Sequence, residues 1–387
     1  MTVIDMRNTL RVCDIALIEI NDQTVWYAEE KIEEGHNTLF LLEYDHNNRQ
    51  ERIVANYILR AEYCRHYFPF PNELLVVMEN GGSSAWILRI DKHTGKEQTF
   101  EQINFIGNFL HCTALDSDHL LIVTGKNETH SHLFTEYHAL TGLPRMAYLY
   151  SLPAKTYHCL KDARLCPPTA NWLVPYQTNS VQHLLVLSPN GSEREKEHCY
   201  QNRTWLGNHV CDQVFVCTVP DLAHAAQTDQ LPELQTLFCA DSSALLRYVG
   251  MDADNLYFKA KYFPWNDQRL CGVQKSTGKR FVAAPLTRTQ HQPPAQFCFD
   301  TANMRGFCIT AQKESLSLQG FFGSTLNAVV PKTGARLLSC IEDRYIITTR
   351  TLPGETTPIT NIYDTQTQQT QSNQSRCKIS GNTVVLY

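Results

Sequence analysis

The stretch Asp91–Phe100 reads DKHTGKEQTF, and it sets the fold that we expect for the whole chain. An apolar run precedes it, and a second strand-like segment follows. A tight turn between antiparallel strands needs one residue at positive φ, which Gly95 supplies without strain. An Asp or Thr before that glycine can bond to the backbone two residues further on. The stretch therefore predicts a strand–turn–strand unit.

Related turns recur along the chain. Counted from glycine to glycine, Gly95 to Gly142 spans 47 residues and Gly142 to Gly191 spans 49. The step from Gly191 to Gly278 is 87, which predicts two repeats with a degenerate turn near Thr228–Gln230. The whole series gives about 46 residues per repeat, which is typical of propeller blades. The copies are Gln274–Arg280, Ala139–Arg145 and Pro331–Arg336, with weaker ones at Tyr44–Gln50, Ser188–Glu193 and Tyr363–Gln369.

Cysteine repeats with a similar spacing. We assign these cysteines to the first, innermost strand of each repeat, either as small buried core residues or as a ring of thiols along a channel. They are Cys13, Cys64, Cys112, Cys159, Cys211, Cys298 and Cys340.

Short apolar runs separated by turn residues dominate the chain, as in Leu74–Met78 and Tyr345–Thr348. The one stretch with helical character is Asp221–Gln227. This pattern predicts an all-β fold. We expect a single closed β-propeller of four-stranded antiparallel blades over residues 1–387, with eight blades favoured over seven. Residues 376–387 would close the ring against the N-terminal segment, because closure removes free sheet edges.

The Asp91–Phe100 turn resembles the blade motif of quinoprotein-like propellers and, more widely, of WD-repeat-like propellers. Asp91, Thr94 and Gly95 match that motif, and Phe100 stands where the family has a tryptophan. The resemblance implies a propeller fold with a binding face. That face carries the loops joining second and third strands and the connections between blades. We expect no cofactor.

The charge balance excludes some classes of protein. With 34 Lys and Arg against 39 Asp and Glu, the net charge is -5, which is not that of an electrostatic nucleic-acid binder. Charged residues interrupt every N-terminal apolar run, and no stretch is long enough to span a membrane. We expect a cytoplasmic protein with reduced cysteines that binds neither nucleic acid nor membranes.

One loop on the expected binding face is rich in aromatic residues. Aromatic side chains beside arginine often anchor protein interfaces. The alternative is that they cover the edge of their own blade. The candidate partner-binding residues are Tyr262, Phe263, Trp265, Asp267 and Arg269.

Two further groups carry possible chemistry. His130 and His132 lie two apart, so on a strand they would share a side and could bind a metal, with Glu128 completing the site. Carboxylates that follow the inner cysteines could act as acid and base, or could bond backbone N–H groups between blades; these are Asp14, Asp212, Asp300 and Asp343.

The dipeptides His111-Cys112 and His158-Cys159 lie 47 residues apart. Neighbours on one strand point to opposite faces, so neither pair can act as a cysteine–histidine nucleophile. We interpret them as equivalent positions of two repeats.

No P-loop, nucleophile elbow or zinc-protease motif is present. The function that we favour is therefore a non-enzymatic scaffold that binds a protein partner on one face. The alternative is a hydrolase or lyase that uses a metal or carboxylates at the mouth of the central channel.

Overall fold

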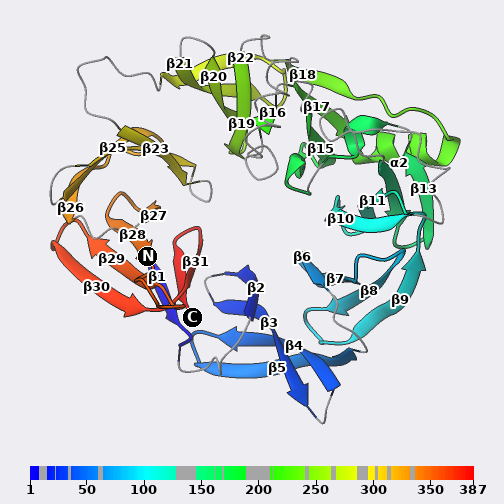
Figure 1. Ribbon diagram of the computed structural model, residues 1–387, viewed down its shortest axis with the longest axis horizontal. Coiled ribbons are helices and arrows are strands. Elements are labelled where there is room, and N and C mark those ends of the chain that lie inside the picture. Colours follow the sequence, from blue (N-terminus) through cyan, green and yellow to red (C-terminus); the bar gives the residue numbers. More distant parts are fainter. Residues whose placement is uncertain are drawn as a thin grey trace. The chain divides into compact units, whose positions relative to one another are not determined.

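The computed structural model in Figure 1 describes most of the chain. Its described residues are 1–7, 15–21, 23–33, 36–59, 64–127, 145–160, 162–167, 170–188, 210–211, 213–239, 244–262, 267–285, 295–300, 304–311, 315–331 and 336–387.

The structure confirms the predicted all-β propeller fold, because the strands group into eight consecutive sheets. Six sheets have four strands each, and a seventh has four strands with the short β16 added at one edge. Within these seven blades every neighbouring pair is antiparallel. The eighth sheet has three strands.

The residues divide into two compact units, which are described separately. Unit 1 joins Met1–Ala61 to Leu286–Tyr387. It holds three four-stranded blades and the three-stranded sheet. Its strands are β1 (Thr2–Asp5), β2 (Ile15–Ile20), β3 (Thr24–Glu33), β4 (His36–Asp45), β5 (Gln50–Leu59), β23 (Ala295–Asp300), β24 (Arg305–Ala311), β25 (Ser315–Phe322), β26 (Asn327–Pro331), β27 (Arg336–Ile341), β28 (Tyr345–Arg350), β29 (Ile359–Asp364), β30 (Gln369–Gln374), β31 (Cys377–Ser380) and β32 (Thr383–Leu386).

Unit 2 spans Glu62–Pro285 and holds the other four blades. Its elements are β6 (Cys64–Pro69), β7 (Glu73–Glu79), β8 (Ser84–Asp91), β9 (Glu97–Asn104), β10 (Asn108–Ala114), β11 (His119–Gly125), β12 (Arg145–Ser151), β13 (Thr156–Leu160), the 3-10 turns η2 (Ala163–Leu165) and η3 (Ala170–Trp172), β14 (Leu173–Thr178), β15 (Val181–Ser188), β16 (Val210–Cys211), β17 (Gln213–Thr218), α2 (Val219–Thr228), β18 (Gln235–Cys239), β19 (Ala244–Met251), β20 (Asn255–Tyr262), β21 (Asp267–Gln274) and β22 (Arg280–Pro285).

The turn within Asp91–Phe100 joins the third and fourth strands of its blade, β8 and β9. The Asp91 carboxylate accepts the backbone N–H of His93 at 2.9 Å and that of Thr94 at 2.7 Å. Gly95 has a φ of 69°, which a side chain would strain. Gly278, between β21 and β22, has the same conformation with a φ of 68°.

Three other glycines used to count the repeats stand elsewhere. Gly142 lies between β11 and β12, Gly191 between β15 and β17, and Gly334 between β26 and β27, so none of them separates the third and fourth strands of a blade. All three are outside the described residues. The degenerate turn expected near Thr228–Gln230 is the end of helix α2, which does join the third and fourth strands of its blade.

The two ends of the chain share one sheet. β1 runs parallel to β32, with Thr2 opposite Thr383 and Asp5 opposite Leu386. Strand β31 completes the sheet on the other side of β32. Residues 376–387 therefore pair with the N-terminal strand, while closure of a single ring stays a prediction.

The core of unit 2 fills the spaces between successive blades. One cluster holds Cys112, Ile122 and Tyr148 together with Val77 of the preceding blade. The other holds Val123 and Ala147 together with residues of the β14–β18 blade. Because side chains alternate along a strand, the two faces of the β10–β13 blade pack against different neighbours.

The cysteine pattern is confirmed in part. Cys112 lies on β10 and Cys340 on β27, each the first strand of its blade, and both are buried. Burial raises the thiol pKa of both, that of Cys340 to about 12. The assignment of Cys159 is wrong, because this residue lies on β13, the fourth strand of its blade. His158-Cys159 is thus not equivalent to His111-Cys112.

Among the described residues, no helix has the length and apolar character that crossing a membrane would require.

Candidate functional site

The strongest candidate site lies between the β10–β13 and β14–β18 blades of unit 2. His111 on β10 is opposite Val123, which is opposite Ala147 on β12. A bulge between Phe109 and His111 shifts the register, and Arg145 lies two residues before Ala147. By alternation, His111 and Arg145 share the face that carries Val123 and Ala147.

His111 is an uncharged imidazole in this space. Its side chain is buried, and Nε2 lies 2.9 Å from the carbonyl oxygen of Pro167 in the connection to β14. Because a carbonyl only accepts, Nε2 carries the proton and Nδ1 is left with a lone pair. Burial, with smaller contributions from Arg145 and His66, lowers the pKa of His111 to about 4, against the opposing effect of the hydrogen bond to Pro167. Nδ1 is buried without a hydrogen-bond partner.

Arg145 brings a positive charge into the same space. Its side chain is 7% exposed, and its Nε and Nη1 atoms have no hydrogen-bond partner. Within the part of the chain that the structure describes, no carboxylate forms an ion pair with it. Burial lowers the pKa of its guanidinium. Thr113, two residues after His111 on the same face, adds a buried hydroxyl that also lacks a partner.

A second pair of titratable groups lies on the other side of β10. His66 Nε2 on β6 is 3.5 Å from Oε1 of Glu79 on β7. The other oxygen of Glu79 accepts the backbone N–H of Gly81 at 2.5 Å. The His66 ring packs against Phe109 of the next blade, with 5.6 Å between the ring centroids. Although the His66 side chain is 32% exposed, its Nε2 atom is buried and Glu79 is buried as well.

Two of these groups have properties that acid–base chemistry needs. His111 offers a neutral lone pair, and Arg145 offers a positive charge without a carboxylate beside it. A buried polar atom without a partner carries a free-energy cost, and such atoms gather at functional sites. No group of three or more His, Cys, Asp or Glu side chains able to hold a metal occurs among the described residues.

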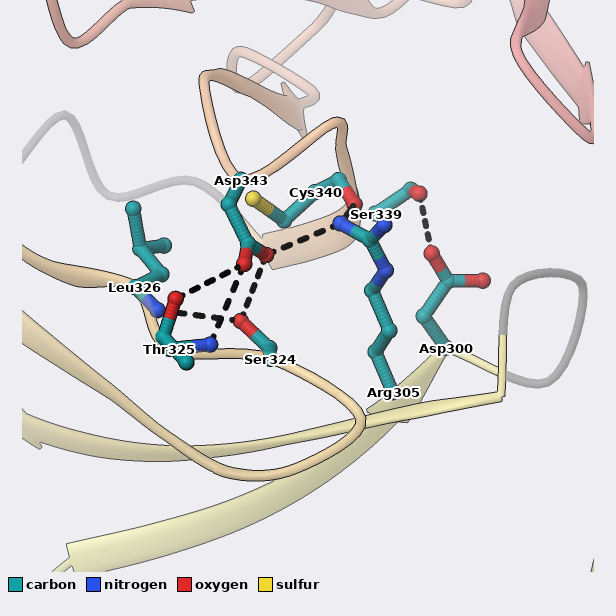
Figure 2. Close-up of polar contacts among 8 residues, drawn as sticks. All are labelled: Asp300, Arg305, Ser324, Thr325, Leu326, Ser339, Cys340 and Asp343. Atoms are coloured by element: carbon teal, nitrogen blue, oxygen red, sulfur yellow. Dashed lines mark hydrogen bonds and ion pairs between the residues drawn. The ribbon is translucent and has the colours of Figure 1, made fainter.

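Two carboxylates of unit 1, Asp300 and Asp343, form hydrogen bonds across the junction between two blades. Figure 2 shows Asp343 accepting from Arg305 Nη1 at 2.9 Å, from Ser324 Oγ at 2.7 Å and from the backbone N–H of Thr325 at 3.1 Å. Although burial opposes it, these hydrogen bonds and the Arg305 charge lower the pKa of Asp343. Asp300, in the same view, accepts the hydroxyl of Ser339. Of the two roles open for these carboxylates, the contacts favour the bonding between blades.

A pocket of about 300 Å³ lies in unit 1 beside the connection between β28 and β29. Asn373, one of its lining residues, is 6% exposed, and its buried side-chain amide nitrogen has no hydrogen-bond partner. The pocket offers hydrogen-bonding groups and one carboxylate but no histidine. Its lining residues are Leu352, Glu355, Thr357, Ile359, Ser372, Asn373 and Gln374.

The structure does not test the site residues proposed from the sequence. His130 and His132 lie outside the described residues, and so do Phe263 and Trp265. Tyr262 ends β20 and Asp267 begins β21, where the two face each other in the ladder. Arg269 is exposed on β21. The loop does join second and third strands, as expected.

His111 was visible in the sequence but was interpreted only as a structural position. The interpretation that His111 and Cys112 point apart agrees with the structure, since Cys112 packs toward the β6–β9 blade. The signal that marks His111 is its contact with Pro167, 56 residues further along, which no local motif reveals.

Comparisons with protein-family models and with curated proteins find no match. Solved structures do match in fold. A prolyl endopeptidase structure superposes with a TM-score of 0.53 at 10% identity, over 93% of this chain and 49% of that one. Pyrococcus horikoshii acylaminoacyl peptidase gives 0.46 at 10%, over 94% and 52%. Oligogalacturonate lyase from Vibrio parahaemolyticus gives 0.44 at 10%, over 90% and 88%.

The predicted non-enzymatic scaffold is contradicted, because the match with a TM-score above 0.5 is to an enzyme, the prolyl endopeptidase, which favours the alternative of a hydrolase or lyase. The scaffold was inferred from missing catalytic motifs, and that inference is wrong here. At 10% identity the likeness itself shows the fold only.

Proposed function

We propose that this protein is an enzyme of the hydrolase or lyase class whose general base is His111. The observation that carries the proposal is the open Nδ1 atom of a buried, neutral imidazole. A base of this kind can take a proton from a water molecule, as in hydrolysis, or from a carbon atom, as in elimination. The hydrogen bond to Pro167 holds the ring in the required tautomer.

Arg145 supplies the electrostatic part of this proposal. Both reaction types develop negative charge on the substrate. In hydrolysis this happens when water adds to the substrate, and in elimination when a proton is removed from it. A positive charge fixed in a site of low dielectric stabilises such charge more strongly than one in water. Arg145 is buried and its charge influences His111, so both groups act in one place.

His111 must return to its neutral form in every turnover. In hydrolysis and in elimination alike, the proton that His111 takes up passes to the leaving group. His66 is a neighbour of this site, since its charge acts on the pKa of His111. Its Nε2 atom is buried and faces Glu79, so His66 has no part in the proposed proton transfer.

The test is a comparison of three proteins on a panel of chromogenic esters, blocked peptides and acidic polysaccharides. The three proteins are the wild type, His111→Gln and His93→Gln. Glutamine keeps a donor for Pro167 but removes the basic lone pair, so we expect a loss of about 100-fold or more in kcat. His93 is exposed in the turn between β8 and β9 and serves as the control.

Turnover by the wild type that His111→Gln retains in full would exclude His111 as the base. No turnover on any substrate of the panel would count against the enzyme class itself. A true base should also give a rate that falls only as the pH drops toward the His111 pKa of about 4.

The cytoplasmic location belongs to the same proposal. Cys112, Cys217 and Cys340 are free thiols in the core. Unpaired buried cysteines are typical of proteins that work in a reducing compartment. The expected protein partner stays a prediction.

A further inference from the structure

Arg145 indicates which kind of ligand would bind between the β10–β13 and β14–β18 blades. A buried guanidinium is usually paired with a carboxylate of the same protein, because an uncompensated charge in the interior is costly. Arg89 of the neighbouring blade illustrates this, since its Nη2 lies 2.7 Å from Oε2 of Glu73. Arg145 departs from the rule, with Nε and Nη1 both unpartnered at 7% exposure.

Glu79, the acid that acts on Cys112 of β10, does not take this role. Glu79 is engaged by the Gly81 backbone N–H and by His66. It also lies toward the opposite face of β10, since its charge acts on Cys112. The positive charge of Arg145 is therefore left for a group that arrives from outside.

The remaining groups beside Arg145 define the charge and the hydrogen-bonding groups of that ligand. The hydroxyl of Thr113 can donate to an anion, and Nδ1 of His111 can accept a hydrogen bond from it. His111 adds no positive charge, because its imidazole is neutral at neutral pH. The site thus has a net charge of one, which a singly charged anion balances. A doubly charged phosphate would leave a negative charge in excess.

We infer that the space between these blades binds a carboxylate-bearing substrate, with Arg145 holding the carboxylate group. This inference rests on the proposed function, because it assigns the substrate class of the same site. The carboxylate accepts hydrogen bonds from the guanidinium of Arg145 and from the hydroxyl of Thr113, and a hydroxyl or acidic C–H group of the ligand is placed at Nδ1 of His111.

The experiment measures binding without turnover, by calorimetry and by the ligand-induced shift in melting temperature. Lactate is the probe, lactamide is its uncharged equivalent and inorganic phosphate is the doubly charged alternative. The proteins are the wild type, Arg145→Gln, Arg145→Lys and Arg247→Gln. Arg247 is exposed in the same unit, so its variant controls for the loss of one charge.

We expect lactate to bind the wild type measurably and to raise its melting temperature. Lactamide should do neither. Arg145→Gln should weaken lactate binding by about 30-fold or more, as removal of one partner of a buried charge pair does. Arg145→Lys should keep part of the affinity, which shows that the variant folds and that charge matters. Arg247→Gln should bind lactate as the wild type does.

Three results would overturn the inference: equal binding of lactate and lactamide, stronger binding of phosphate than of lactate, or lactate binding that Arg145→Gln leaves unchanged. Lactate binding that depends on Arg145, in a protein without turnover, would refute the proposed function and leave this inference standing. Turnover that depends on His111 but not on Arg145 would refute this inference and leave the proposed function standing.

Discussion

At the scale of single residues, His111 should make the stability of the protein depend on pH. Its pKa in the folded protein is about 4, below the ordinary value of about 6.5. Between these values the unfolded chain binds a proton that the folded chain does not. The free energy of unfolding should therefore fall as the pH drops from about 6.5 to about 4, by roughly 3 kcal/mol from this group.

Denaturant unfolding of the wild type and of His111→Gln across this pH range measures the effect as a difference in slope. His119→Gln is the control with the opposite sign, because the hydrogen bond that His119 donates to the Asp116 carboxylate raises the pKa of His119. The stability that His119 contributes is complete at low pH and is lost as the pH rises through its folded pKa. Parallel pH profiles for the wild type and His111→Gln would show that His111 is not the buried neutral group described here.

Arg145 leads to a second prediction about stability. Replacing a buried charge that has no partner by an apolar side chain of similar length removes a cost, so Arg145→Met should raise the free energy of unfolding by roughly 1–3 kcal/mol in the absence of ligand. Arg89→Met is the matched comparison and should lower it, because Glu73 would lose its ion-pair partner. Urea unfolding of both variants decides the matter, and a destabilised Arg145→Met would mean that Arg145 supports the fold.

At the scale of the elements, the turns between third and fourth strands carry a prediction about glycine. Gly278 has a φ of 68°, and a Cβ there would meet only Leu237 at an ordinary distance of 3.8 Å. Gly278→Ala should therefore cost about 1–2 kcal/mol through backbone conformation alone. Ser276→Ala in the same turn should change the stability by less than about 0.5 kcal/mol. Equal thermal unfolding of the two variants would contradict the assigned turn.

The turns also show how far the sequence could predict the fold. Gly95 and Gly278 could be identified because positive φ is a local demand that selects glycine. Gly142 and Gly334 could not be placed, because the same Thr-Gly pair occurs outside the turns between third and fourth strands, where spacing alone does not separate them. Helix α2 replaces one turn. Its start is marked locally by Thr218, whose hydroxyl accepts the Asp221 N–H at 3.1 Å. From the sequence this signal indicates only a short helical stretch.

The candidate site was much harder to predict than the blades. Residue alternation along β10 could be inferred, and it correctly separated His111 from Cys112. The neighbours of His111 could not be inferred, because Arg145 comes from another strand and Pro167 from the connection to the next blade. Their meeting depends on the bulge at Phe109–His111, which leaves no clear mark in the sequence.

At the scale of the whole molecule, the pairing of the chain ends should matter for stability. Val384, Val385 and Leu386 on β32 are completely buried, and β32 is bonded to β1 and β31. Deleting residues 376–387 would remove these core side chains, expose residues packed against them, such as Ile4 and Ile347, and leave β1 without its partner. We expect the shortened protein to lose its cooperative thermal transition or to unfold at a much lower temperature. An unchanged melting temperature would contradict the assigned sheet.

The measurement that tests the central claim most directly is a nitrogen-15 NMR titration of the His111 ring, assigned by comparison with His111→Gln. The account predicts a neutral ring protonated at Nε2, with no change in charge until the pH approaches about 4. A ring protonated at Nδ1, or one that titrates near the ordinary value of about 6.5, would contradict it. In either of those cases His111 could not be the base of this site.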